Sequence, residues 1–379
     1  MKYNYPLFIC FFTVFLSKAQ TVVTSDKFNL PETVEETSGL IYYDNKLITH
    51  NDSGNAAELY EIDTSNGSIV RTVSITNATN VDWEDIAQDN TYIYIGDIGN
   101  NYGNRTNLKF YRILKTDFDS STNVTADVIN YSYADQTDFT SNLNNNNWDS
   151  EAFVVYDNYL LIFSKNWANN EVDVYTIPNT VGTHSAVKVS TYNSQGLITG
   201  ADVVGSNKIY LSGYSVSSNI TPFLIEIYNL DISAPLNLDV FTNSKSVKLN
   251  NFLPFGNQVE GICFIETNGF SDTLYISNEK LVASIFTFPS KLRALTIDNS
   301  TLRAFNFIKN DGFIIHPNPF ENEIKFSDNA EEIKIYNSLG SCVLSQNATN
   351  SINTSELSPG FYTISVTYKK MLVTKKMIK

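Results

Sequence analysis

The sequence predicts an all-β protein: a β-propeller followed by a small C-terminal β-sandwich. Three observations lead to this prediction: a composition rich in strand-forming residues, a hairpin pattern that recurs along the chain, and a change of sequence character after residue 310. The hairpins begin 46 to 67 residues apart. A hairpin unit at this period is typical of propellers, in which each blade is one four-stranded sheet.

Composition and charge narrow the class of protein further. Aromatic residues make up 13% of the 379, and Asn, Asp and Gly separate short apolar runs, as expected for strands joined by turns. The formal net charge is −14, and residues 20–311 alone carry 17 basic and 34 acidic side chains, a net of −17. We therefore expect neither nucleic acid nor an anionic membrane as a partner, whereas cations suit such a surface.

The N-terminal segment predicts export from the cytoplasm. Lys2 precedes an apolar run over residues 7–16, and Ser17-Lys18-Ala19 places small residues at the −3 and −1 positions of a cleavage site. We therefore expect residues 1–19 to be a signal peptide. The run is too short to span a membrane comfortably, and no later segment is long and apolar enough, so the sequence predicts no transmembrane segment in the mature chain.

Five segments of residues 20–310 can be laid over one another. Each opens with a polar or acidic position, continues as an alternating apolar strand, turns, and ends a second strand at Gly, Ser, Asn or Asp. The five segments begin at Glu36, Asp82, Asp149, Ile198 and Gln258. Five blades are thus detectable, and a sixth within the longest interval, between Glu84 and Glu151, stays open.

A strand expected over residues 21–29 precedes the first repeat. It could close the ring by completing the last blade. Similar apolar runs also occur in β-sandwiches and β-solenoids, but the internal repetition favours the propeller.

Polar residues at the strand ends form the candidate site. The first strand of each blade lines the central channel and the second strand runs back beside it, so the alignment gathers these residues at one face. Starts of first strands supply candidate metal ligands, namely Asp82, Glu84, Glu151, Asp202 and Glu260. Ends of second strands and the turns after them supply candidate ligand-binding residues, namely Asp52, Asp97, Arg105, Lys165, Tyr214 and Glu279.

Two interpretations of these residues stay open. A ring of carboxylates and amide oxygens suits a hard cation, and Ca²⁺ is the cofactor that we expect if the ring is functional. The alternative is structural, because acids at strand ends cap turns and accept hydrogen bonds from backbone N–H groups of the neighbouring blade. Arg105 has the same ambiguity, since it could meet an anionic ligand or form a structural ion pair.

Motifs in the repeats resemble those of a family of secreted bacterial propellers of largely uncharacterised function. The shared motifs are Asn51-Asp-Ser-Gly54, Asp82-Trp-Glu-Asp-Ile-Ala87, Gly96-Asp-Ile-Gly-Asn-Asn101, Asp149-Ser-Glu-Ala152 and Thr199-Gly-Ala-Asp202. More distantly, the strand starts are similar to those of SdiA-regulated and esterase-like phytase propellers. That resemblance implies an acidic channel around Ca²⁺. In the motif at residues 96–101, however, Asn100 stands where the family of secreted propellers has Asp, which removes one acid.

Residues 311–379 resemble the type A sorting domain of the type IX secretion system. The resemblance rests on Pro317-Asn-Pro319, Ile335-Tyr-Asn-x-x-Gly340, the segment Asn353–Tyr362 and Lys375-Lys-x-Ile-Lys379, in that order. It implies that the type IX machinery is a partner of this domain. It also implies that the protein passes through the periplasm and is then secreted or held at the outer-membrane surface.

The sequence leaves two functions open. The first is a non-enzymatic propeller that binds a small molecule, glycan or protein, and it is favoured because no nucleophile–base arrangement is recognisable. The second is a metal-dependent hydrolase of phosphoester, ester or lactone substrates, in which a cation in the acidic channel polarises the scissile group or activates water. Whether the protein is an enzyme is therefore undecided at this stage.

Overall fold

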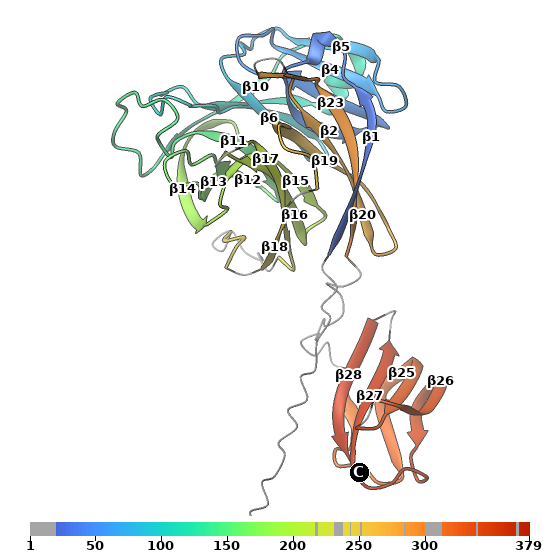
Figure 1. Cartoon of the computed structure of the whole chain (residues 1–379). Coiled ribbons are helices and arrows are strands. Elements are labelled where there is room, and N and C mark those ends of the chain that lie inside the picture. Colours follow the sequence, from blue (N-terminus) through green and yellow to red (C-terminus); the bar gives the residue numbers. More distant parts are fainter. Residues whose placement is uncertain are drawn as a thin grey trace, which may run out of the picture. The chain divides into compact units, whose positions relative to one another are not determined.

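A computed structural model describes residues 20–216, 219–230, 238–242, 244–250, 252–283, 286–299, 313–338, 340–368 and 371–379. The predicted signal peptide, residues 1–19, lies outside the described residues. The chain divides into two compact units, residues 1–301 and 302–379, each built from strands (Figure 1). Within the described residues no helix is long and apolar enough to cross a membrane.

The first unit consists of four-stranded blades arranged in chain order. Blade 1 has strand order β2-β3-β4-β5, formed by β2 (Thr37–Tyr43), β3 (Lys46–Asn51), β4 (Glu58–Asp63) and β5 (Ile69–Ile75). The short 3₁₀ helix η1 (Glu32–Val34) precedes it. Blade 2 is formed by β6 (Trp83–Gln88), β7 (Tyr92–Asp97), β8 (Lys109–Leu114) and β10 (Asp127–Tyr133).

Blades 3 and 4 repeat this order. Blade 3 is formed by β11 (Ser150–Tyr156), β12 (Tyr159–Ser164), β13 (Val172–Pro178) and β14 (Gly182–Tyr192). Its outer strand β14 also pairs in parallel with β10 of blade 2, so the two blades share one continuous sheet. Blade 4 is formed by β15 (Leu197–Val204), β16 (Lys208–Ser215), β17 (Thr221–Tyr228) and β18 (Lys245–Asn250).

Blade 5 is completed by the first strand of the described chain, as expected. It is formed by β19 (Val259–Asn268), β20 (Ser271–Asn278), β23 (Lys291–Asp298) and β1 (Thr21–Asn29). The strand β1 pairs antiparallel with β23, which fastens the start of the propeller to its last blade. A small hairpin of β21 (Leu281–Ala283) and β22 (Phe286–Phe288) lies between β20 and β23 in the chain.

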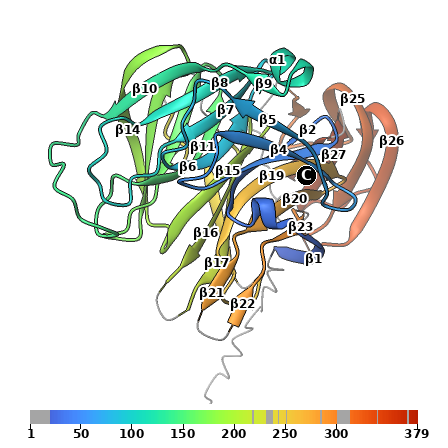
Figure 2. The ribbon, with the colours of Figure 1, turned by 90° about the horizontal axis from the view of Figure 1, so that it is seen from above.

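The described chain forms five blades. The inner strands contact one another in a closed cycle, β2 to β6, β6 to β11, β11 to β15, β15 to β19 and β19 back to β2. Both ribbon views place these five strands in the middle of the unit (Figures 1 and 2). The long interval between Glu84 and Glu151, all of which is described, holds no sixth sheet. Its extra length consists of α1 (Lys115–Ser120), β9 (Asn123–Val124), which pairs with β5, and the loop 134–149.

Apolar alternation in the strands explains the packing of the blades. Successive side chains of a strand point to opposite faces, so each inner strand supplies two neighbouring cores. Phe153 packs in the core between blades 2 and 3, whereas Val154 packs in the core between blades 3 and 4. Five such clusters lie between successive blades around the ring.

The second unit is a small antiparallel β domain. Its strands are β24 (Ile315–His316), β25 (Glu323–Tyr336), β26 (Cys342–Asn353), β27 (Phe361–Tyr368) and β28 (Met371–Ile378). The long strand β25 pairs with β24 and β27 along one edge and with β26 along the other, and its register shifts between Lys325 and Ala330. One core, with Ile333 and Ile364 fully buried, supports the unit.

Candidate functional site

A β-bulge near the start of every inner strand positions the candidate site. The pairing of each inner strand with the second strand of its blade shifts register close to its first residue. A bulge leaves a residue out of the ladder and re-aims its side chain. The side chains at these positions are Glu84, Glu151 and Glu260 in blades 2, 3 and 5, and Ser38 and Thr199 in blades 1 and 4.

Two of the bulge glutamates form the centre of a carboxylate cluster. One carboxylate oxygen from each of Asp52, Asp82 and Glu84 lies within 4.8 Å of the others, and the same holds for Glu84, Asp149 and Glu151. Glu84 belongs to both groups. We call these five residues, Asp52, Asp82, Glu84, Asp149 and Glu151, the acidic cluster. Three blades supply it, with Asp52 following β3, Asp82 and Glu84 at the start of β6, and Asp149 and Glu151 at the start of β11.

Burial and mutual repulsion shift the protonation of the cluster. Burial, followed by the charges of Asp52 and Asp149, raises the pKa of Asp82 to about 7. Burial, followed by the charge of Glu151, raises the pKa of Glu84 well above its usual value. Without a counter-charge, part of the cluster therefore holds protons near neutral pH, whereas a bound cation would favour the ionised forms.

Glu84 is the member without a partner. Its residue is only 4% exposed, and among the described residues its carboxylate forms neither a hydrogen bond nor an ion pair shorter than 4 Å. Other members are better satisfied: Asp149 accepts hydrogen bonds from the backbone N–H of Asn100 at 2.6 Å and from Nε1 of Trp167 at 2.8 Å. A carboxylate at this depth with no protein partner is costly, so a proton, a cation or the water that reaches its oxygens has to compensate its charge.

Lys165 is the principal buried cation beside the cluster. Its ammonium group forms an ion pair with Glu151 and lies 4.8 Å from the ring centre of Trp167 and 5.3 Å from that of Tyr214. Burial opposes its charge, but the carboxylate of Glu151 holds the pKa of Lys165 well above its usual value. Lys165 and Tyr214, both predicted to contact a ligand, are thus brought together, and both are almost fully buried.

Arg105 forms internal contacts at the edge of the cluster. Its Nη2 lies 2.6 Å from Oδ1 of Asp97, and its Nη1 donates to the carbonyl oxygen of Gly99 at 2.6 Å and lies 4.0 Å from Asp82. These contacts hold the loop after β7 against the start of β6. Arg105 therefore forms the structural ion pair that the sequence left open, and its contact with an anionic ligand stays a prediction.

Glu260 and Glu279 of blade 5 are charged neighbours of Lys165. The carboxylate of Glu279 accepts a hydrogen bond from Nε2 of Gln258 at 3.0 Å. Burial, followed by the charge of Glu151, raises the pKa of Glu260 well above its usual value, and Lys165 opposes this shift. These two residues are electrostatic neighbours of the acidic cluster, but they belong to neither close group of carboxylates.

Asp202 lies apart from the cluster, contrary to the sequence alignment. The bulge of β15 places Thr199, not Asp202, at the position of Glu84 and Glu151. Asp202 lies further along the strand, where its carboxylate accepts hydrogen bonds from the backbone N–H of Phe264 at 2.6 Å and of Val203 at 2.8 Å. It therefore links blade 4 to blade 5, which is the structural role that the sequence left open.

Asp85, which was not predicted from the sequence, also links blades. Its carboxylate accepts backbone N–H groups of Phe153 at 3.1 Å, Ala201 at 3.3 Å and Ile86 at 2.8 Å. One fully buried side chain of blade 2 thus joins the inner strands of blades 3 and 4. The sequence places Asp85 in the first strand of its blade but does not show which N–H groups it meets.

Two further contributors to the site were not singled out from the sequence. Trp167 orients Asp149 through its indole N–H. Gly99 leaves room for the carboxylates, because a Cβ at this residue would lie 2.1 Å from Oε1 of Glu84 and 2.4 Å from Oδ2 of Asp82. Gly99 belongs to the motif Gly96-Asp-Ile-Gly-Asn-Asn101, and this close approach is the physical reason for a glycine there.

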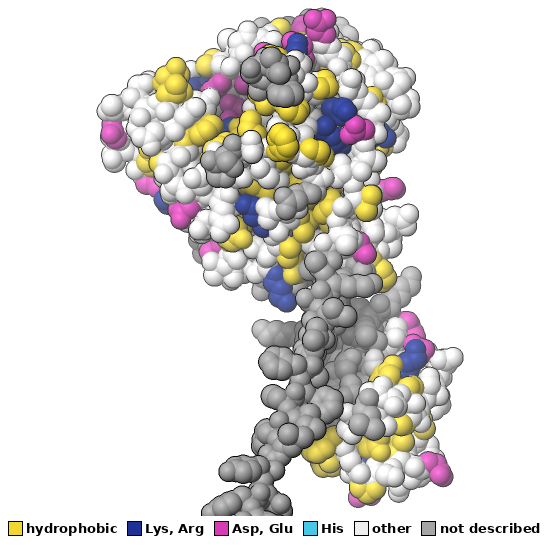
Figure 3. All heavy atoms as spheres, viewed as in Figure 1, with side chains coloured by type: hydrophobic (Ala, Val, Ile, Leu, Met, Phe, Trp, Pro, Cys, Tyr) yellow, Lys and Arg dark blue, Asp and Glu magenta, His cyan; other side chains and the backbone are white. Residues whose placement is uncertain are grey.

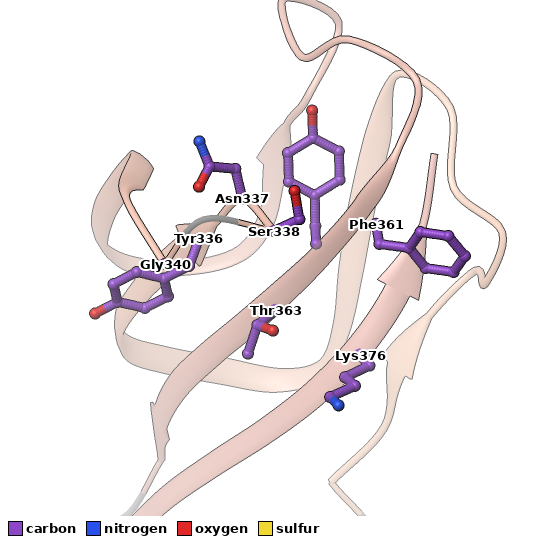
Figure 4. A pocket seen from close by; sticks show the side chains of 8 residues that line it. Tyr336, Asn337, Ser338, Gly340, Phe361, Thr363 and Lys376 are labelled. Carbon is purple, nitrogen blue, oxygen red and sulfur yellow. The ribbon is translucent and has the colours of Figure 1, made fainter. Parts of the chain in front are cut away.

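A separate hollow occurs on the second unit. It is lined by Tyr336, Asn337, Ser338, Gly340, Phe361, Tyr362, Thr363 and Lys376 (Figure 4). Phe361 is 70% exposed there. The lining contains no carboxylate, so this hollow does not have the chemistry of the acidic cluster.

The second unit matches a known family. Residues 314–379 match the family described as the secretion system C-terminal sorting domain. This match confirms the prediction of a sorting domain and of the type IX secretion machinery as its partner. The protein is therefore a type IX secretion substrate that is extracellular or located at the cell surface.

Comparison of the whole chain with other proteins gives only a distant likeness. No curated protein matches the chain. Among solved structures, BamB from Moraxella catarrhalis is 10% identical, with 90% of this chain and 83% of that chain covered and a TM-score of 0.24. Two structures of the extracellular domain of BT4673 from B. thetaiotaomicron are 10% identical, with TM-scores of 0.29 and 0.32. They cover 90% and 96% of this chain, which spans 56% and 59% of theirs. At this identity and these TM-scores, the likeness carries no information on ligand or activity.

Proposed function

We propose that this protein is an extracellular binding propeller whose acidic cluster holds a divalent cation, Ca²⁺, as part of a ligand site. The observation that carries the proposal is Glu84, a buried carboxylate without a partner that belongs to both groups of close carboxylates. Ca²⁺ takes six to eight oxygen ligands, so three carboxylates would leave coordination positions for water or for a ligand.

The group formed by Asp52, Asp82 and Glu84 is the better candidate for the cation. Among the described residues, Asp82 has only Arg105, at 4.0 Å, as an oppositely charged partner, and Asp52 accepts one hydrogen bond, from the backbone N–H of Ser53. Asp52 and Asp82 are half-buried, so the group is open to solvent on one side. In the second group both oxygens of Asp149 are already engaged, and Glu151 is paired with Lys165.

The proposal is tested by the metal content and stability of the purified full-length protein. We expect one Ca²⁺ per chain by elemental analysis. At a free Ca²⁺ concentration 100 times the dissociation constant, binding adds about 2.7 kcal/mol to the free energy of unfolding. Removal of the ion by a chelator should then lower the melting temperature by roughly 5 °C or more.

Glu84→Gln should separate the two effects of this carboxylate. The substitution removes a ligand, so the response to chelator should disappear. It also removes a buried unpaired charge, so in chelator the variant should be more stable than the wild type. Glu171→Gln, in the loop between β12 and β13, is the matched control and should keep the wild-type response. A wild type that contains no metal and does not respond to chelator would refute the cation site.

A metal-dependent hydrolase is the second candidate, and one observation favours it. Glu84 is shared by two groups of carboxylates, as a carboxylate that bridges two cations would be. Against this function, the described residues of the cluster hold no nucleophile next to a free base, because Lys165 is paired with Glu151. Cation-dependent turnover of nitrophenyl esters or phosphates that is lost in Glu84→Gln would favour the hydrolase over the binding protein.

A further inference from the structure

Beside the acidic cluster lies a lobe formed by two loops of blade 2 and its neighbour. We define the lobe as residues 98–108, between β7 and β8, and residues 134–148, between β10 and β11. All of these residues are described. Loops of these residue numbers, coloured cyan to green, project from the ring in both ribbon views (Figures 1 and 2).

Hydrogen bonds join the two loops to each other and to the cluster. The backbone N–H groups of Asn142 and Asn144 donate to the carbonyl oxygens of Tyr102 and Asn101, at 2.9 and 3.0 Å. Asn100 is the link to the cluster, because its N–H donates to Asp149 at 2.6 Å and its side-chain amide donates to the carbonyl oxygen of Trp148 at 2.9 Å. The lobe is therefore a built structure with a fixed position beside the carboxylates.

The lobe exposes apolar side chains. Tyr102 and Leu143 are each 52% exposed, and Phe139 is 42% exposed. Tyr102 follows Asn100 by two residues, so its Cα lies within about 7 Å of the Cα of a residue that contacts the cluster. This spacing is short enough for a short oligosaccharide to reach from the cluster to Tyr102.

Exposed amides outnumber exposed charges in the lobe, whose exposed acids are Asp135 and Asp138. Asn104, Asn144 and Asn145 are exposed, and the hydrogen bonds that hold the lobe do not use their side-chain amides. Each amide offers a donor and an acceptor, which is what neutral hydroxyl groups require. On the face of the propeller shown in Figure 3, uncharged atoms likewise cover most of the surface and charged side chains are scattered.

We propose that the acidic cluster and the lobe together bind a neutral carbohydrate, with hydroxyl groups on the bound cation and a sugar ring against Tyr102. This inference rests on the proposed function, since it requires the cation. The net charge of −17 over residues 20–311 disfavours a polyanion, and exposed amides stand beside the exposed apolar side chains of the lobe, which suits the hydroxyl groups of a sugar. Open coordination positions on Ca²⁺ accept oxygen ligands, among them pairs of hydroxyl groups.

The test is electrophoresis of the full-length protein through gels that contain a neutral polysaccharide: starch, laminarin, galactomannan or xylan. We expect at least one of them to retard the wild type in Ca²⁺ and not in chelator. Tyr102→Ala should weaken this retardation about five- to tenfold, as loss of one aromatic contact would. Phe270→Ala is the matched control, because Phe270 is 56% exposed in the turn between β19 and β20, at the far end of the inner strand, and should leave the retardation unchanged.

The outcomes separate this inference from the proposed function. Stoichiometric Ca²⁺ in a protein that none of the four polysaccharides retards would overturn the carbohydrate site and leave the cation site standing. Retardation that persists in chelator, or that is equal in wild type and Tyr102→Ala, would also overturn it. Absence of Ca²⁺ from the protein would refute the cation site itself, and with it the carbohydrate site that depends on the cation.

Discussion

Asp85→Ala should lower the free energy of unfolding of the propeller more than Asp→Ala does at a position on the surface. Asp85 is fully buried and accepts the backbone N–H groups of Phe153 and Ala201, which belong to two other blades. Its removal would leave both groups without this acceptor in a channel closed by five inner strands. An unpaired buried polar group costs about 1–3 kcal/mol, so the expected loss is about 2–6 kcal/mol in the free energy of unfolding.

This loss is large for a domain whose total stability is on the order of 5–15 kcal/mol. It corresponds to a fall in the melting temperature of roughly 5–15 °C. The measurement is urea and thermal unfolding followed by circular dichroism, in chelator, so that a cation at the adjacent Glu84 does not contribute. Asp85→Asn keeps one acceptor oxygen and the volume of the side chain, so it should lose less than Asp85→Ala.

Asp89→Ala is the matched control for Asp85→Ala. Asp89 also accepts two backbone N–H groups, those of Thr91 and Tyr92, at 2.6 and 2.7 Å, and the hydroxyl group of Tyr94 at 2.8 Å, but it lies half-buried in the turn between β6 and β7. Water can replace it there, so this variant should lose about 1 kcal/mol. Equal losses for Asp85→Ala and Asp89→Ala would refute the argument that Asp85 joins the blades.

Three further predictions concern the cluster, the channel and the sorting domain. Gly99→Ala places a methyl group against the carboxylates of Glu84 and Asp82, so chelator should no longer lower the melting temperature of this variant. A variant that keeps the wild-type response to chelator would contradict the placement of the cation. Burial raises the pKa of Asp202 to about 7 from 3.8, so its stabilising effect is complete below about pH 4 and is lost as the pH rises to about 7. The free energy of unfolding of the wild type, relative to that of Asp202→Asn, should therefore fall by on the order of 4 kcal/mol between about pH 4 and about pH 7. A difference between the two proteins that stays constant over this range would contradict the raised pKa of Asp202. Deletion of residues 314–379 should leave the protein in the periplasm, which cell fractionation would detect, and secretion of the shortened chain would show that export does not need this domain.

Much of the fold follows from local patterns in the sequence. Alternating apolar residues in the repeats predict the strands, because each inner strand must bury both faces between two neighbouring blades. The expectation that residues 21–29 complete the last blade agrees with the pairing of β1 and β23. The motifs of residues 311–379 are specific enough to predict the sorting domain, since they recur in a fixed order over a short segment.

The site residues were predicted less completely. The alignment of repeats brought Glu84, Glu151 and Lys165 to one face, because the ends of inner strands converge around an axis. It misplaced Asp202, because the residue of blade 4 at the bulge position is Thr199 and Asp202 lies three residues further along the strand.

The sequence determines the strands, their order and the destination of the protein, because these depend on alternation, turn residues and a short contiguous motif. Only the tertiary structure decides which acids are linkers and which have no partner. Asp85 and Glu84 are adjacent in the chain, yet one accepts three backbone N–H groups and the other accepts none. The physical reason is that the partners of Asp85 come partly from strands about 70 and 115 residues away, and their distance to a carboxylate is set by the closure of the ring.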